Sequence, residues 1–235
     1  MSIKAILFDL DGTLLPLDQE KFSATYFKTL AEKLVPYGYD PEKMAKSIWS
    51  GVREMMLNNG SATNEEVFWK HFCSIWGKNA RKDEPVFEEY YRNEFDAAKA
   101  ACGYNEKAAK TVRTLKARGY RVVLATNPVF PPIATQKRMN WAGFTPEDFE
   151  LYTTYDNSSF CKPKVEYYSE ILKKMGLSPE EVLMVGNDVR EDMVARKLGI
   201  KVFLMPECLI NRDNEDISQF PSGNFDDLLK YIDSL

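Results

Sequence analysis

Two aspartates near the start of the chain, Asp9 and Asp11, have types and a spacing that could do chemistry. They follow the apolar run Ile6-Leu7-Phe8, which is typical of a strand covered on both faces in a parallel sheet. Such sheets bind ligands at the carboxyl ends of their strands, near a switch in strand order. The pair therefore stands where a site is expected, although Asp11 and the glycine after it could instead form only a turn.

A carboxylate pair of this kind suits phosphoryl transfer. One carboxylate can attack phosphorus and form an acyl phosphate, which is hydrolysed much more easily than a phosphate ester. A second carboxyl group can protonate the leaving alkoxide and later accept a proton from the attacking water. Asp9 fits the first role, and Asp11 fits the second.

Later segments of the chain supply other groups that this reaction needs. Thr126 ends the predicted strand 121–126 and can offer its hydroxyl and backbone N–H groups to phosphoryl oxygens, while Asn127 can add a further donor. Lys162, which precedes a proline, can place a positive charge beside Asp9. Each has a plainer interpretation, because a threonine can simply stop a strand and a lysine can lie on the surface.

An acidic cluster that includes Asp188 and Asp192 follows the predicted strand 182–185. Together with Asp9 and Asp11, these aspartates would concentrate negative charge and repel an anionic substrate. A hard divalent cation such as Mg²⁺ resolves this, since it takes oxygen ligands and can bridge carboxylates and phosphate oxygens. The plainer interpretation of Asp188 and Asp192 is an acidic helix amino terminus, which the helix dipole favours.

Taken in order, these segments resemble the four motifs of the haloacid dehalogenase (HAD) superfamily. The motifs stand at residues 9–13 (Asp-x-Asp-Gly-Thr), at Thr126, at Lys162 and at residues 182–192. The resemblance covers residues 1–15 and 100–205 well, and the stretch between them only in size and helical character. Since dehalogenases of this family lack the second acid, Asp11 favours a phosphoryl substrate over a haloacid.

The resemblance also implies which residues act. Those assigned to catalysis are Asp9, Asp11, Thr126 and Lys162, and those assigned to substrate binding are Thr126, Asn127 and Lys162. The implied metal ligands are the Asp9 carboxylate, the Asp11 backbone carbonyl and the Asp188 carboxylate. Asn187 is the alternative to Asp188, because some members place Gly-Asp directly after the strand. The spacing from Asp188 to Asp192 favours Asp188, and any contact of Asn187 or Asp192 with the metal shell stays open.

Helical periodicity runs through residues 16–103, with helices expected at 21–35, 41–57, 64–76 and 85–101. The aromatic residues that are dense here should form the core of a small helical bundle. By resemblance, an all-helical insertion directly after the first motif is a cap domain. A lid in that position can close over Asp9 and exclude water from the reaction.

Residues 1–15 and 104–235 alternate between strand and helix patterns, which predicts βαβ units and a parallel sheet. Strands are expected at 121–126, 151–154, 182–185 and 201–204, and helices at 105–118, 132–142, 164–175, 189–198 and 225–234. Residues 206–223 are polar without a clear period and are expected to form a surface loop. The predicted fold is therefore α/β, with a Rossmann-like, HAD-like core, helices on both faces of its parallel sheet, and the inserted helical cap domain.

Composition limits the class of protein. With 235 residues, 44% of them hydrophobic, the chain can bury a full core, and its net charge of −4 offers no electrostatic footprint for nucleic acid. No apolar run approaches membrane-spanning length, and the first strand begins too early for a signal peptide, so no membrane partner is expected. Four separated cysteines and a single histidine argue against a zinc site and favour a reduced, cytoplasmic setting.

These observations predict an enzyme, a Mg²⁺-dependent phosphatase that hydrolyses a small phosphorylated metabolite through a phospho-Asp9 intermediate. A phosphomutase of the β-phosphoglucomutase kind is an alternative, because it would use the same core. A non-catalytic phosphate-binding or regulatory protein is an alternative of another class, against which the complete acidic set speaks. The sequence does not identify the substrate, the residues of the cap that contact it, or the oligomeric state, which is monomer or dimer.

Overall fold

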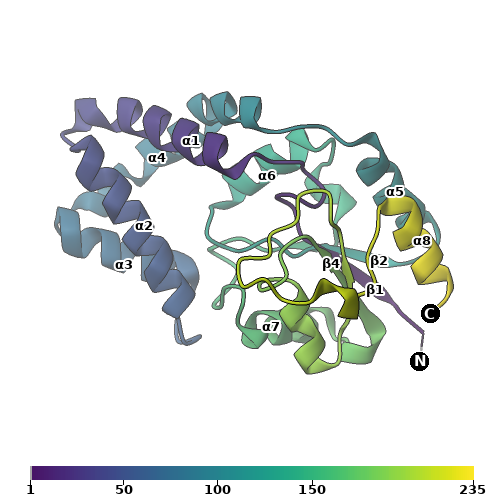
Figure 1. Cartoon of the computed structure of the whole chain (residues 1–235). Coiled ribbons are helices and arrows are strands. Elements are labelled where there is room, and N and C mark those ends of the chain that lie inside the picture. The colour runs from purple at the N-terminus through teal and green to yellow at the C-terminus, as the bar shows by residue number, and fades with distance from the viewer. Residues whose placement is uncertain (1) are drawn as a thin grey trace.

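The computed structural model describes residues 2–235, and within them five parallel strands form one sheet in the order β3-β2-β1-β4-β5. The strands are β1 (Ala5–Phe8), β2 (Arg121–Leu124), β3 (Leu151–Tyr152), β4 (Val182–Gly186) and β5 (Lys201–Leu204). After β1 the chain builds the sheet outward on one side and then crosses to the other. The strand order therefore switches at β1, which lies in the middle of the sheet (Figure 1).

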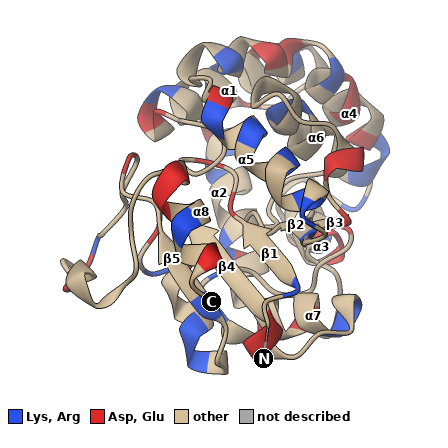
Figure 2. Ribbon diagram, turned by 90° about the vertical axis from the view of Figure 1, so that its right-hand side faces the viewer, with Lys and Arg blue, Asp and Glu red and all other residues tan. Residues whose placement is uncertain are grey.

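Alternate side chains of the strands face two different helical layers. Ile6 and Phe8 pack in one apolar cluster with α5 (Glu106–Ala117), α6 (Pro132–Trp141) and α8 (Phe225–Asp233). Ala5 and Leu7 pack in a second cluster, with α7 (Val165–Met175) and the 3₁₀ segment Met193–Leu198. The strands are nearly free of charge, whereas the helices around them carry both signs (Figure 2). The prediction of a parallel α/β sheet covered on both faces is confirmed.

The segment between β1 and α5 is helical and lies beside the sheet (Figure 1). Its elements are α1 (Gln19–Leu34), α2 (Pro41–Leu57), α3 (Asn64–Trp76), α4 (Glu84–Arg92) and the 3₁₀ segment Glu94–Ala101. Side chains cap the amino termini, since the Asp18 carboxylate accepts from the Lys21 N–H, and Thr63 forms a capping box with Glu66. These helices bury a dense set of aromatic rings against one another.

The two connections between this helical segment and the sheet run side by side. Leu17 and Cys102 form an isolated antiparallel bridge. The Gly103 N–H donates to the Pro16 carbonyl at 2.8 Å, and the Asp18 N–H donates to the Ala101 carbonyl at 3.0 Å. The chain thus leaves the sheet layer and returns to it through two short linkers that are hydrogen-bonded to each other.

Two of the predicted helices are wrong in form. The helix expected at 85–101 breaks at Asn93, and its second half is 3₁₀. The helix expected at 189–198 begins as a turn and becomes 3₁₀ only from Met193. In that turn the Asp188 carboxylate accepts backbone N–H groups of Arg190 and Glu191, so side-chain hydrogen bonds replace the first helical turn. Over residues 2–235 no helix is both long and apolar enough to cross a membrane.

Candidate active site

The carboxyl ends of β1, β2 and β4 bring three polar residues together. The Asp9 N–H donates to the Val185 carbonyl at 2.9 Å, and the Ala125 N–H donates to the Phe8 carbonyl at 2.7 Å, so the strand pairing continues to the point where the polar residues begin. Asp9, Thr126 and Asp188 line one cavity of about 150 Å³ at this edge. The position of the site at the switch in strand order agrees with the general rule for open α/β sheets.

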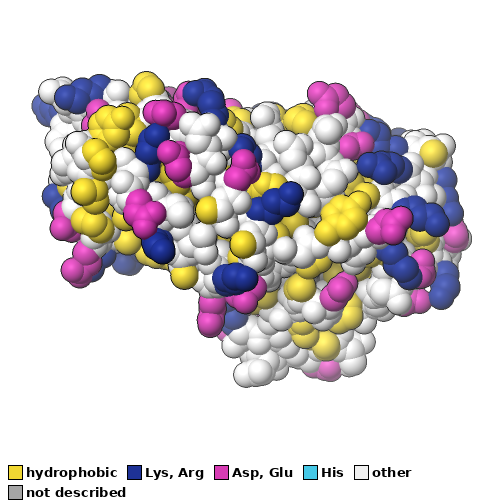
Figure 3. Space-filling model, turned by 90° about the horizontal axis from the view of Figure 1, so that it is seen from above, with side chains coloured by type: hydrophobic (Ala, Val, Ile, Leu, Met, Phe, Trp, Pro, Cys, Tyr) yellow, Lys and Arg dark blue, Asp and Glu magenta, His cyan; other side chains and the backbone are white. Residues whose placement is uncertain are grey.

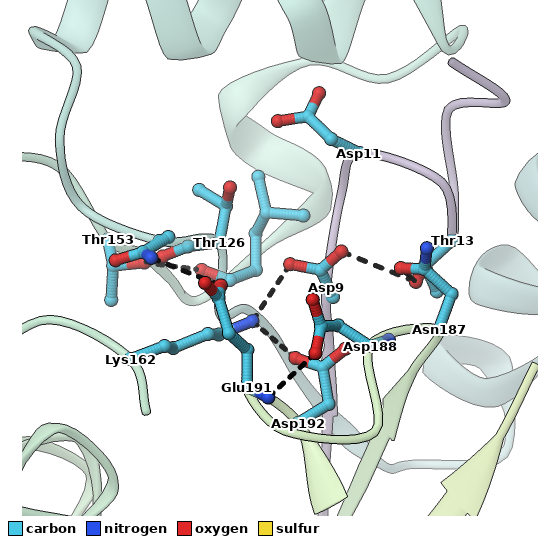
Figure 4. A network of polar contacts seen from close by, with 12 residues as sticks. Asp9, Asp11, Thr13, Thr126, Thr153, Lys162, Asn187, Asp188, Glu191 and Asp192 are labelled. Carbon is cyan, nitrogen blue, oxygen red and sulfur yellow. Dashed lines mark hydrogen bonds and ion pairs between the residues drawn. The ribbon is translucent and has the colours of Figure 1, made fainter. Parts of the chain in front are cut away.

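Lys162 joins two of the carboxylates that line this cavity. Its ammonium donates to Asp9 Oδ1 at 2.8 Å and to Asp192 Oδ1 at 2.6 Å, and only 1% of the lysine is exposed. Burial disfavours the charged ammonium, but the Asp192 and Asp9 carboxylates outweigh it and raise the pKa of Lys162 well above its ordinary value. Lys162 is therefore a fixed positive charge beside Asp9 (Figure 4).

Asp11 points away from Asp9 and Lys162 (Figure 4). Its Oδ2 pairs with the guanidinium of Arg138, a fully buried side chain of α6 that stacks on the Phe130 ring at 4.5 Å. Asp11 Oδ1 is buried and has no hydrogen-bond partner in residues 2–235. Burial raises the pKa of the Asp11 carboxyl, and Arg138 offsets part of this rise. A raised pKa suits a carboxyl group that must give up a proton to a leaving group.

Asp188 is fixed on both of its oxygens. Oδ1 accepts the N–H groups of Arg190 and Glu191, each at 2.9 Å, and Oδ2 accepts from Arg212 Nη1 at 2.7 Å. Arg212 comes from the segment expected to be a surface loop, and it remains half exposed. That segment is fastened to the site because the Ile210 N–H donates to the Asn187 carbonyl and its carbonyl accepts from the Val189 N–H, both at 2.9 Å.

Asn187 and Asp192, the two residues whose metal contact the sequence left open, are engaged elsewhere. Asn187 Oδ1 accepts from the Thr13 hydroxyl at 3.0 Å, and its Nδ2 donates to the Cys208 carbonyl at 2.6 Å. Asp192 accepts from Lys162 and, at 2.9 Å, from the Asp188 N–H. Both side chains therefore shape the loop around Asp188.

Thr126 and Asn127 lie on the wall of the cavity that β2 supplies. The Thr126 carbonyl accepts from the Thr153 hydroxyl at 2.6 Å and from the Tyr167 hydroxyl at 2.9 Å, which fixes the strand end. Asn127 Nδ2 donates to Glu191 Oε2 at 3.1 Å. Burial raises the pKa of Glu191, whose side chain also lines the cavity.

The structure thus brings all the predicted site residues to one edge of the sheet, where all but Lys162 line the cavity and Lys162 bonds to two carboxylates that do. The sequence reasoning missed three charged residues that line this cavity, namely Arg138, Arg212 and Glu191. Glu191 stands inside the acidic motif, so its position was a usable signal. Arg138 and Arg212 lie on a helix and in a polar loop respectively, and no local pattern separates them from other surface arginines.

A divalent cation fits the charge of this site. Among the described side chains here, five carboxyl groups (Asp9, Asp11, Asp188, Glu191 and Asp192) face three cations (Arg138, Lys162 and Arg212), so acidic groups outnumber basic ones. No group of three His, Cys, Asp or Glu side chains in residues 2–235 has the arrangement of a metal cage. The candidate ligands are thus two carboxylates, of Asp9 and Asp188, and the Asp11 carbonyl, and Mg²⁺ characteristically completes such a set with water and phosphate oxygens.

The chain is similar in sequence and in fold to known proteins. Residues 3–199 match the model of a hydrolase family, the haloacid dehalogenase-like hydrolases. Pyrophosphatase PpaX of Bacillus cereus (strain AH820) is 25% identical over 201 residues, 86% of this chain and 82% of that protein. Phosphoglycolate phosphatase of Aquifex aeolicus (strain VF5) is 23% identical over 236 aligned residues, 99% of this chain and 98% of that protein. The crystal structure of a predicted phosphoglycolate phosphatase from Haemophilus somnus 129pt has a TM-score of 0.57 and 20% identity, with 98% of each chain covered.

The family model spans all four motifs and most of the chain. The solved structure agrees with the fold over nearly the full length. By its sequence, its sheet and the residues at the switch point, this chain belongs to the haloacid dehalogenase-like hydrolase family.

Proposed function

We propose that this hydrolase is a phosphatase that hydrolyses a small phosphorylated metabolite through a phospho-Asp9 intermediate and requires Mg²⁺. The observation that carries the proposal is the separation of the two aspartates. Asp9 contacts a buried ammonium, while Asp11 pairs with Arg138 and has one buried oxygen that finds no partner among residues 2–235. Two carboxyl groups in such different environments can take the two different roles that the reaction needs.

In the first step an Asp9 oxygen attacks phosphorus, and the bond to the leaving oxygen breaks. The Asp11 carboxyl gives its proton to the departing alkoxide. In the second step water attacks the acyl phosphate, Asp11 accepts a proton from this water, and Asp9 is released as a carboxylate with free phosphate. The fixed charge of Lys162 lies beside the attacking Asp9 carboxylate and can balance the charge of the phosphoryl oxygens.

Mg²⁺, when bound by Asp9, Asp188 and the Asp11 carbonyl, would supply further charge neutralisation for the phosphoryl group. Thr126 and Asn127 stand at the end of β2, on the cavity wall, where their donors suit the remaining phosphoryl oxygens. The relatives named above are a pyrophosphatase and a phosphoglycolate phosphatase, and this supports phosphoryl hydrolysis as the reaction class.

The helical segment is part of the proposal. We assign residues 1–15 and 104–235 to the core domain and residues 16–103 to a cap domain that closes over Asp9. The paired linkers at Leu17 and Cys102 support this division, because one narrow crossing lets two packed bodies turn against each other. Closure would exclude bulk water while the acyl phosphate forms.

The test is hydrolysis of p-nitrophenyl phosphate by the purified chain, followed by mass analysis of the peptide that contains Asp9. We expect phosphate release with Mg²⁺ and none after addition of a chelator, since the excess of acidic groups over cations would then stay uncompensated at the site. Rapid quenching during turnover should reveal a mass increase of one phosphoryl group on that peptide. Full activity in chelator, or an Asp9→Asn variant that still turns over, would sink the proposal.

A further inference from the structure

A second cavity, of about 220 Å³, lies between the helical segment and the stretch 129–131 of the sheet layer. Its walls are mainly aromatic, and they include Tyr26, Phe27, Trp49, Trp69, Phe87 and Tyr91. The hydroxyl groups of Tyr26 and Tyr91 form a hydrogen bond with each other at 2.9 Å. Trp69 Nε1 is buried and has no hydrogen-bond partner among residues 2–235, but the walls are otherwise mainly apolar. The cavity is therefore a place for a mainly apolar group, whose burial it would favour roughly in proportion to its area.

The charges around this cavity restrict its ligand further. Among the described residues that line it, none is a lysine or an arginine. The acidic members, Glu84 and Glu88, are already paired with Arg81 at 3.3 Å and with Arg92 at 2.8 Å. A carboxylate or a second phosphate would find no counter-charge here, and a cation would find only acids that are already neutralised.

This aromatic cavity adjoins the candidate active site. Val129 and Phe130 line both cavities, so one stretch of backbone forms the wall between them. Phe130 contacts the aromatic cluster through the Phe22 and Tyr26 rings, at centroid distances of 6.4 and 5.7 Å. A substrate held at Asp9 through its phosphoryl group therefore has the aromatic cavity next to it, beyond Val129 and Phe130.

We propose that the substrate is a phosphate monoester whose organic part is a neutral apolar group, aryl or alkyl, held in the aromatic cavity while the phosphoryl group lies at Asp9. This inference rests on the proposed phosphatase function and adds the class of substrate to it. It separates this chain from relatives named for pyrophosphate and phosphoglycolate, whose substrates carry a second anionic group.

The first experiment compares substrates that differ only in the apolar group. For n-alkyl phosphates from methyl to hexyl, kcat/KM should rise by about threefold per methylene until the cavity is full. Phosphoglycolate and pyrophosphate should be poorer substrates than hexyl phosphate. Choline phosphate should be no better than 3,3-dimethylbutyl phosphate, which has the same shape without the positive charge. The inference is overturned if kcat/KM does not change along the alkyl series. It is also overturned if phosphoglycolate or pyrophosphate is a better substrate than hexyl phosphate, or choline phosphate a better one than 3,3-dimethylbutyl phosphate.

A pair of variants locates the effect. Ser23 is a small, half-buried residue of α1 that lines the cavity, and its neighbour Ala24 points to solvent. Ser23→Phe should fill the cavity and reduce the ratio of kcat/KM for hexyl over methyl phosphate by about tenfold or more, whereas Ala24→Phe should keep the wild-type ratio. Because the readout is a ratio, a general loss of activity cancels. An unchanged ratio in a folded Ser23→Phe protein contradicts the assignment of this cavity.

Binding to the wild-type protein gives a measurement that needs neither turnover nor a variant. Alkylphosphonates titrated into the chain with Mg²⁺ should bind more tightly as the alkyl group lengthens, and methylphosphonate should bind most weakly. If no monoester is hydrolysed, the activated p-nitrophenyl phosphate included, the phosphatase proposal fails, while the phosphonate series still reports on the cavity. Equal affinity across the phosphonates overturns the inference even if hydrolysis is observed.

Discussion

Lys162 is the residue on which the charges of the site depend. Its buried ammonium bonds to two carboxylates, of Asp9 and Asp192, so one cation compensates two anions that are largely removed from water. Truncating one partner of such a buried group leaves the others without compensation, which is far more destabilising than the net value of the contact.

Replacing Lys162 by methionine should therefore lower stability as well as activity. We expect Lys162→Met to reduce the free energy of unfolding by about 3 to 5 kcal/mol, measured by urea denaturation. Adding Asp192→Asn should restore part of this stability without restoring phosphate release, since Asp9 would still lack its cation. Lys173→Met, at an exposed position of α7, is the matched control and should change little. Wild-type stability in Lys162→Met would show that the ion pairs do not form in solution.

Replacing each of the two aspartates of the first motif should affect catalysis in a different way. Asp9→Asn removes the nucleophile and should give no phosphoenzyme with any substrate. Asp11→Asn keeps the nucleophile but loses the acid and base, so alkyl phosphates should slow by about 10²- to 10⁴-fold and an activated aryl phosphate by much less. Because water then lacks its base, phospho-Asp9 should accumulate, visible as a burst of aryl alcohol. Loss of turnover in Asp11→Asn alone, with Asp9→Asn active, would reverse the two roles.

At the scale of elements, the segment between β5 and α8 takes part in the site. The sequence predicted only a surface loop here, because its polar residues show no period. In the structure Ile210 bonds to the backbone on both sides of Asp188, and Arg212 pairs with the Asp188 carboxylate. The segment thus adds a half-exposed positive charge to the edge where the metal is proposed to bind.

Removing this charge should tighten metal binding. A doubly charged cation and a unit positive charge about 4 Å apart in water repel each other by roughly 2 kcal/mol, which corresponds to about thirtyfold in affinity. We expect Arg212→Ala to bind Mg²⁺ more tightly, by up to about thirtyfold in calorimetric titration, and Asp188→Ala to bind it far more weakly. Arg190→Ala, which removes an exposed arginine side chain from the loop that carries Asp188, serves as the control. Weaker binding in Arg212→Ala would mean that the arginine orients Asp188 instead of competing for it.

The elements that the sequence predicted well are those with strong local signals. The helices 41–57 and 64–76 begin at capped, acidic turns and match the structure at both ends. Asp9, Thr126 and Asp188 could be placed because each follows a strand of the same parallel sheet, whose carboxyl ends must meet. Arg138 could not, since its partner Asp11 lies 127 residues away in sequence and only the packing of α6 on the sheet brings them together.

At the scale of the whole molecule, the helical segment and the sheet share one apolar cluster. The chain connects them only through the two paired linkers at Leu17 and Cys102. Charged side chains of both signs are interspersed over the face of the molecule seen in Figure 3, and the exposed Trp49 and Leu57 come from α2. The narrow crossing suits the proposed division into a core and a cap, since the two parts could then turn against each other at their shared apolar surface.

We therefore expect structures with and without a phosphate analogue to differ mainly by rotation of residues 16–103 about the paired linkers. Crystallography, or small-angle scattering with hexylphosphonate and Mg²⁺, would measure the change. Replacing Gly103 by proline removes the hydrogen bond to Pro16 and should lower kcat and alter KM together, as hinge changes do. If the helices keep one position in both states of an active protein, the cap does not act as a lid.

Phe130 has a consequence for how such a protein can diverge. Its ring belongs to the wall of the aromatic cavity and also supports Arg138, which in turn holds Asp11. A mutation that trims this ring to admit a different substrate would disturb proton transfer at the same time. Val52 and Trp49 line only the aromatic cavity, so changes there can alter substrate range and spare the chemistry. Natural selection for new substrates should accordingly vary α2 and leave Phe130 in place.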